Sequence, residues 1–69
     1  MYRIKVESSA IKEIGYHPEK EILEVLFAND TAYQYVKVGF EDYMNLIRAE
    51  SIGKHFADMK ESFQYARIQ

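Results

Sequence analysis

Ser51, His55 and Asp58 are the residues of this 69-residue chain whose types most resemble catalytic machinery. They are spaced at i, i+4 and i+7 in a segment with helical periodicity, so one helix face would carry all three side chains. Nucleophilic catalysis also needs a base oriented by a buried acid and an oxyanion hole. The sequence contains no nucleophile elbow and no phosphate-binding glycine loop, and Ser51 suits the N-cap of the helix better. We therefore predict that the protein is not an enzyme and has no catalytic residues.

The histidines and the acidic run offer no better chemistry. His17 lies in a predicted turn and His55 in a distant helix, so they lack the spacing of metal ligands on one element. The chain has no cysteine, which excludes disulfides and sulfur-ligated zinc. The glutamates at positions 19, 21 and 24 are interpreted as solvated surface. A paired-carboxylate mechanism needs one acid whose pKa is raised by burial. We expect no metal and no cofactor.

Tyr33, Tyr35 and Lys37 alternate along a predicted strand and would therefore share one face. Aromatic rings on a sheet, next to a cation, can stack the unpaired bases of single-stranded RNA. The competing interpretation is that the two tyrosines pack in the core, which is the commoner role of paired strand tyrosines. Other basic residues are scattered and could converge on the same surface only in the fold. The candidate binding residues are Tyr33, Tyr35, Lys37, Lys12 and Lys54.

The face of these tyrosines depends on the turn before them. A two-residue turn at Asn29–Asp30 would place Tyr33 and Tyr35 on the face of Glu24 and Leu26, opposite the apolar face of Leu23, Val25 and Phe27. A three-residue bulged turn would instead place both tyrosines with the apolar residues. The two-residue turn separates polar from apolar residues better, so we favour it and expect a partly exposed tyrosine stripe.

Strands must position these residues, and the period-two pattern identifies them. Residues 10–16, 22–27 and 32–38 are predicted to form a three-stranded antiparallel meander, with Pro18 and Asn29–Asp30 in its turns. Residues 2–6 alternate as a strand or extended arm, and residues 63–68 as a short C-terminal strand or docked arm.

Past Gly39 the apolar period changes to that of helices. Phe40, Tyr43, Met44 and Ile47 form one stripe, and Ile52, Phe56 and Met59 form another. Gly53 costs stability inside the second helix, so we expect close packing there. The predicted fold is α+β: the meander followed by two short helices.

Length and composition fix the scale of the protein. Sixty-nine residues with a net charge of −2 indicate one domain, residues 1–69, without the basic surface of a strong duplex binder. A core of this size is marginal, so nearly every large apolar side chain is needed. No apolar run is long enough to span a membrane. The N-terminus lacks a signal-peptide pattern and cysteine is absent, so we expect a cytoplasmic protein.

Five short motifs together resemble the KTSC domain family, which occurs at the C-terminus of some lysyl-tRNA synthetases and as stand-alone bacterial proteins. The resemblance covers residues 6–65, and the family's only suggested role is RNA binding, so it implies no catalytic residues. The chain departs from the family pattern at Asn29–Asp30, Gly39 and Ala57. The motifs are Ser8-Ser9, Ile14-Gly15-Tyr16, Leu23-x-Val25-x-Phe27, Tyr33-Gln34-Tyr35 and Ser51-x-Gly53-x-x-Phe56.

From the residues and the resemblance together we expect a non-enzymatic binding module that binds RNA through the sheet face bearing Tyr33 and Tyr35. The alternative is a protein-interaction or self-association domain, because an apolar sheet face or an open edge strand can be completed by a protein partner or a second copy. A coherent positive surface around the tyrosines would favour RNA, and an apolar patch would favour protein.

Overall fold

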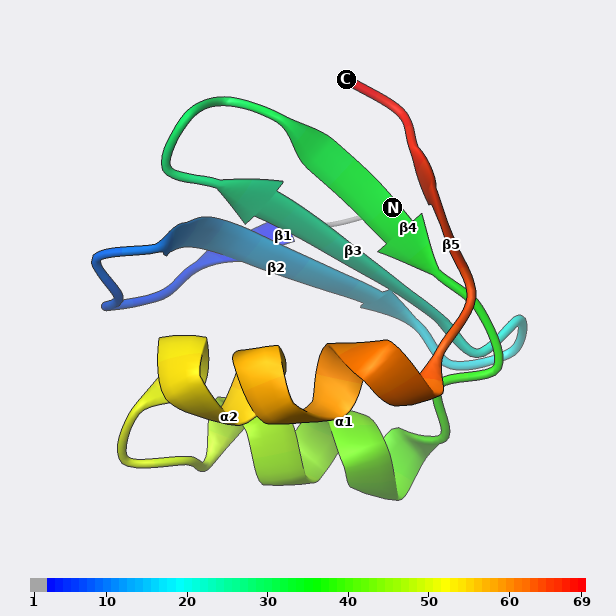
Figure 1. Ribbon diagram of the computed structural model, residues 1–69. Coiled ribbons are helices and arrows are strands. Elements are labelled where there is room, and N and C mark those ends of the chain that lie inside the picture. Colours follow the sequence, from blue (N-terminus) through cyan, green and yellow to red (C-terminus); the bar gives the residue numbers. More distant parts are fainter. Residues whose placement is uncertain (1–2) are drawn as a thin grey trace.

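The computed structural model describes residues 3–69, in which two helices cover one face of a five-stranded antiparallel sheet (Figure 1). The strands lie side by side in chain order, so both edges of the sheet are formed by the ends of the chain. The elements are β1 (Arg3–Lys5), β2 (Ile11–His17), β3 (Ile22–Phe27), β4 (Ala32–Tyr35), α1 (Phe40–Ile47), α2 (Ile52–Met59), a one-turn 3-10 helix η1 (Lys60–Ser62) and β5 (Tyr65–Arg67).

The α+β class is confirmed, but the prediction of a three-stranded sheet undercounts the strands. β1 and β5 add one strand at each edge, each only three residues long. Their alternating pattern was visible in the sequence, but it did not say which strand each would pair with. β5 returns beside β4 only after both helices, pairing Tyr65 with Tyr35. Tyr2, part of the predicted first segment, lies outside the described residues.

The turn between β3 and β4 has three residues, so the favoured two-residue register is wrong. The N–H of Phe27 donates to the Thr31 carbonyl at 2.8 Å, and the N–H of Asp30 donates to the Phe27 carbonyl at 3.0 Å. Asp30 alone in this turn has a positive φ, 68°, as expected for a type I turn closed by one left-handed residue. Tyr33 therefore pairs with Val25, and Tyr35 pairs with Leu23.

β4 also ends earlier than predicted, which removes Lys37 from the tyrosine stripe. Lys37 has a φ of 58°, in the left-handed region, so the chain leaves the sheet after Tyr35. The N–H of Val38 then donates to the Glu21 carbonyl at 2.9 Å, and the Val38 side chain is fully buried. Alternation along the strand therefore stops before it reaches the lysine.

The stripe predicted for α2 matches the structure, with Phe56 buried and Ile52 and Met59 half-buried. The stripe predicted for α1 is wrong in part, because Leu46, which was not in it, is fully buried and Phe40, which was, is 57% exposed.

The Ser51 hydroxyl oxygen accepts a hydrogen bond from the Lys54 N–H at 3.3 Å, which confirms Ser51 as the N-cap of α2. A Cβ on Gly53 would lie 3.0 Å from the Ser8 hydroxyl oxygen, so the predicted close packing is confirmed. Leu46 of α1 and Phe56 of α2 are the buried residues of their helices.

The core lies between the helices and the sheet. Its buried residues come from the three central strands, from the loop after β4 and from both helices, whereas β1, η1 and β5 contribute none. No helix within residues 3–69 is both long and apolar enough to cross a membrane. The core cluster consists of Ile11, Ile14, Leu23, Val25, Tyr35, Val38, Leu46 and Phe56.

The sheet face opposite the helices buries one charged residue. Glu24 pairs with Gln34 on β4 and accepts hydrogen bonds from the Gln34 amide, at 2.9 Å, and from the Arg3 guanidinium. Gly15 lies between Arg3 and Glu24 in the sheet and has no side chain to separate them. Burial by itself would raise the pKa of Glu24, but the Gln34 and Arg3 hydrogen bonds and the Arg3 charge outweigh it, so the pKa is lowered. The observed register of β3 and β4 thus gives Glu24 the Gln34 partner that the favoured register would have denied it.

Candidate ligand-binding groove

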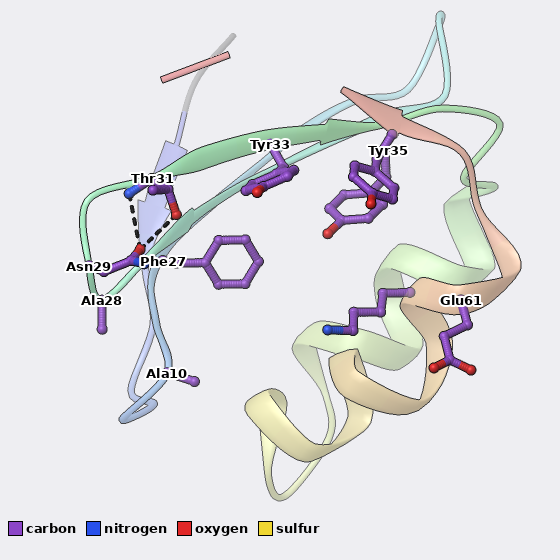
Figure 2. A pocket seen from close by; sticks show the side chains of 10 residues that line it. Ala10, Phe27, Ala28, Asn29, Thr31, Tyr33, Tyr35 and Glu61 are labelled. Carbon is purple, nitrogen blue, oxygen red and sulfur yellow. Dashed lines mark hydrogen bonds between the residues drawn. The ribbon is translucent and has the colours of Figure 1, made fainter. Parts of the chain in front are cut away.

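An open groove of about 590 Å³ lies on the helix side of the sheet, beside β4 and β5. We call it the tyrosine groove, because Phe27, Tyr33, Tyr35 and Tyr65 supply its aromatic wall. Figure 2 shows Phe27, Tyr33 and Tyr35 extending from neighbouring strands into the same space. Four rings from three strands meet there because the observed register places all of them on one face.

The rings contact one another in varied orientations. Tyr33 lies edge-on to Phe27, with centroids 5.6 Å apart, and is tilted against Tyr65 at 5.5 Å. Tyr35 lies edge-on to Phe56 of α2 at 5.2 Å. Offset and edge-to-face contacts of this kind are the favourable ones between aromatic rings. The contacts therefore fix the wall of the groove and connect it to the core.

Exposure divides the tyrosines into a buried and an accessible group. Tyr35 is only 4% exposed, so it supports the wall from behind and cannot stack a ligand on its ring. Tyr65 is 62% exposed, and Tyr33 is intermediate. Burial raises the pKa of Tyr35, and the neighbouring Tyr33 and Tyr65 raise it further. Tyr65 and Tyr33 are therefore the rings that a ligand can reach.

The charges at the groove nearly cancel. Lys60 and Glu61 of η1 both line it, one of each sign. Within residues 3–69 Lys60 forms no ion pair, so its ammonium group is available to an anionic ligand. The Glu61 carboxylate points away from the labelled tyrosines in Figure 2. The groove thus combines accessible rings with one available cation.

Of the five predicted binding residues, Tyr33 and Tyr35 line the groove and the three lysines do not. Lys12 forms an ion pair with Asp30 in the β3–β4 turn. Lys37 follows β4 in the left-handed conformation, and Lys54 is exposed in the first turn of α2. These lysines do not converge around the tyrosines.

Phe27, Tyr65 and Lys60 are groove residues that sequence reasoning did not assign to the site. Phe27 follows from the three-residue turn, which puts it on the face of the tyrosines. Tyr65 follows from pairing the C-terminal strand with β4, since it then lies directly beside Tyr35. The alternation in residues 63–68 was the available signal for Tyr65. Lys60 was visible only as one of the scattered basic residues that could converge in the fold.

Comparison with known proteins identifies the family. The family model described as KTSC domain matches residues 7–65. An uncharacterized protein of Stutzerimonas stutzeri (strain A1501) is 37% identical over 70 residues, covering 99% of this chain and 99% of its own. A protein of Tsukamurella paurometabola is 43% identical over 49 residues, covering 71% of this chain and 73% of its own. The crystal structure of the KTSC domain protein YPO2434 from Yersinia pestis superposes with a TM-score of 0.94 at 35% identity, covering 99% of this chain and 97% of that one.

Proposed function

The chain belongs to the KTSC domain family, and on that basis together with its tyrosine groove we propose that it is a non-enzymatic module that binds single-stranded RNA. One observation carries the proposal: accessible aromatic rings and an unpaired cation line the same open groove. In this proposal an unpaired base stacks on Tyr65 and Tyr33 while Lys60 contacts an adjacent phosphate. The proposed site thus keeps Tyr33 of the expected pair, puts Tyr65 in the place of the buried Tyr35, and replaces the three lysines with Lys60.

The groove lacks the coherent positive surface that would favour RNA by charge, so the proposal rests on the accessible rings. With one available lysine beside one glutamate, phosphate contacts contribute little, so stacking supplies most of the affinity. A single phosphate contact gives a slope of about −0.7 in log affinity against log salt for a single strand. We therefore expect weak binding that depends on the base and responds only slightly to salt.

NMR titration with short oligoadenylate and oligouridylate tests the proposal. We expect shift changes at Tyr33 and Tyr65, and tighter binding of adenylate because the larger purine ring stacks over more area. Tyr65→Ala removes the accessible ring and should lower affinity about 5- to 150-fold, since stacking is worth about 1–3 kcal/mol per base. Tyr65→Phe keeps the ring and should bind nearly as well as the natural protein.

Phe40→Ala is the matched control, because Phe40 is 57% exposed and does not line the groove. An equal loss of RNA affinity in Tyr65→Ala and Phe40→Ala would contradict the proposed site. Polyphosphate that displaces RNA as efficiently as free oligonucleotide would show that charge alone drives the binding. An absence of shift changes at Tyr33 and Tyr65 would refute RNA stacking in the groove.

A further inference from the structure

Within residues 3–69, the main-chain groups on the outer edge of β5, next to the tyrosine groove, have no hydrogen-bond partner. The Val36 N–H donates to the Gln64 carbonyl, and the Ile68 N–H donates to the Ala32 carbonyl. Because inward and outward groups alternate along an antiparallel strand, the N–H and C=O groups of Tyr65 and Arg67 point away from β4. Figure 1 shows β5 along the margin of the sheet. In the part of the chain that the structure describes, the main-chain groups of Tyr65 and Arg67 are therefore free to form hydrogen bonds with another strand.

We propose that β5 pairs antiparallel with β5 of a second copy, about a two-fold axis at Ala66. Tyr65 then lies opposite Arg67 of the second copy, and each such pair exchanges two main-chain hydrogen bonds. The same register places a cation beside an exposed tyrosine ring twice, once on each side of the axis. The edge is complementary to itself, which is what a closed two-fold interface requires.

The small residue at the axis makes the approach possible. Ala66 lies opposite Ala66 of the second copy in a non-hydrogen-bonded pair, where side chains approach most closely. The other edge of the sheet is less suited to this pairing, since β1 paired with itself about Ile4 would place Arg3 opposite Lys5 of the second copy, two like charges. The Arg67 Nε donates to the Gln69 carbonyl at 2.9 Å, which leaves the other guanidinium donors free.

The dimer also completes the groove. Tyr65 and Arg67 lie on the helix side of the sheet, in register with Tyr35 and Tyr33. Arg67 of the second copy would therefore lie beside each accessible Tyr65 and add a cation to a groove that has only Lys60. This consequence rests on the proposed RNA binding, whereas the pairing itself does not.

Sedimentation equilibrium without RNA tests the pairing on the full chain, from about 10 μM to about 1 mM. We expect a reversible monomer–dimer equilibrium, because a single pair of short edge strands buries less surface than a stable dimer needs. Arg67→Pro removes an outward N–H while sparing the bonds to β4, and should weaken dimerisation at least about tenfold. Lys5→Pro makes the same change on β1 and should leave the dimer intact. A strict monomer at 1 mM, or equal weakening by both variants, would overturn the pairing.

Cross-linking provides a second readout that does not depend on affinity. The chain has no cysteine, so Ala66→Cys introduces a single thiol at the proposed axis. A non-hydrogen-bonded antiparallel pair falls within the Cα separation that a disulfide spans. We expect Ala66→Cys to oxidise to a dimer at least about tenfold faster than Ala57→Cys, which places a thiol on the exposed face of α2. Equal oxidation rates of the two variants would refute the proposed axis, whether or not the protein binds RNA. Faster oxidation of Ala66→Cys in a protein that does not bind RNA would support the dimer and refute only the proposed function.

Discussion

Two aromatic clusters of this protein contain similar residues but differ in how far their rings are buried and in what those rings contact. In the first, Tyr16 of β2 stacks flat on Tyr43 of α1, with centroids 4.4 Å apart and planes 6° apart, and Phe40 lies tilted against both. The Tyr16 hydroxyl donates to the Val38 carbonyl at 2.6 Å. The second cluster is the wall of the tyrosine groove, where Tyr65 remains exposed.

The two clusters differ in what contacts the hydroxyl and the ring faces of each tyrosine. In the first cluster Tyr16 has both a stacked neighbour and a hydrogen-bond acceptor, so it joins the sheet to the start of α1. In the second, Tyr35 is buried against Phe56, while Tyr65 has an accessible face. Aromatic residues in a small domain are therefore not equivalent: burial and partners, rather than residue type, separate a structural ring from a ring that a ligand can reach.

The largest effect should come from Tyr35→Ala. It removes a buried ring from contact with Phe56, at a cost of about 3–5 kcal/mol for a large aromatic side chain. A chain of this length has a stability of roughly 3–10 kcal/mol, so the variant should be partly or fully unfolded at 25 °C. Urea denaturation followed by circular dichroism measures the loss. Tyr35→Phe should cost under about 1 kcal/mol, and equal costs for the two variants would show that the hydroxyl, not the ring, matters.

Tyr16→Phe should have a smaller effect, in the first cluster. The change removes the hydrogen bond to the Val38 carbonyl but keeps the stacked ring, so we expect a loss of about 0.5–1.5 kcal/mol. Urea denaturation of Tyr16→Phe and Tyr43→Phe side by side isolates the hydroxyl. A stability loss in Tyr43→Phe as large as in Tyr16→Phe would contradict the assigned role of this hydrogen bond.

Alkaline titration should distinguish the two clusters, because the pKa of Tyr16 and the pKa of Tyr35 are raised by different neighbours. Burial raises the pKa of Tyr16, and the nearby charges of Glu21 and Asp42 raise it further, whereas burial and neighbouring tyrosines raise the pKa of Tyr35. The folded state thus holds these protons more tightly, so stability is fully present below pH 10 and falls as pH rises toward the folded pKa. Because salt screens charges, 1 M NaCl should lower the pKa of Tyr16 more than that of Tyr35. NMR titration of labelled tyrosine measures the pKa of each residue. An equal response of the two pKa values to salt would contradict the assigned difference between the clusters.

The smallest stability effects should come from the exposed rings. Tyr65→Ala and Phe40→Ala each remove a largely solvated side chain, so each should change the free energy of unfolding by only about 0.5 kcal/mol. Thermal denaturation checks this directly. A loss of several kcal/mol in Tyr65→Ala would mean that its ring is structural, and the division between the two clusters would fail.

Much of the fold could be predicted from local pattern. The bounds of β3, the apolar stripe of α2, the Ser51 cap and the packing at Gly53 all match, because alternation, capping and backbone crowding act over a few residues. The short edge strands were harder. Three exposed residues carry little apolar signal, so pairing with β2 or β4 is what makes β1 and β5 strands.

The candidate site was predicted only in part. Tyr33 and Tyr35 were found by residue type, but their face was wrong because a one-residue change in the turn reverses every side chain that follows it. Polarity favoured the incorrect register, since it grouped Val36 and Val38 with the apolar face and left the tyrosines beside Glu24. In the structure Glu24 pairs with Gln34 and with Arg3, a partner from a distant strand that local pattern cannot supply.

The sequence by itself determined that this is a small α+β domain, which residues alternate along each strand and where the helices begin. Those properties depend on the geometry of a single element. Only the tertiary structure decided which strand face the helices cover, that β5 lies beside β4, and that Tyr65 and Lys60 join the tyrosines. The physical reason is that a register is set by one backbone conformation, at Asp30, together with the packing of Tyr35 on Phe56 far along the chain.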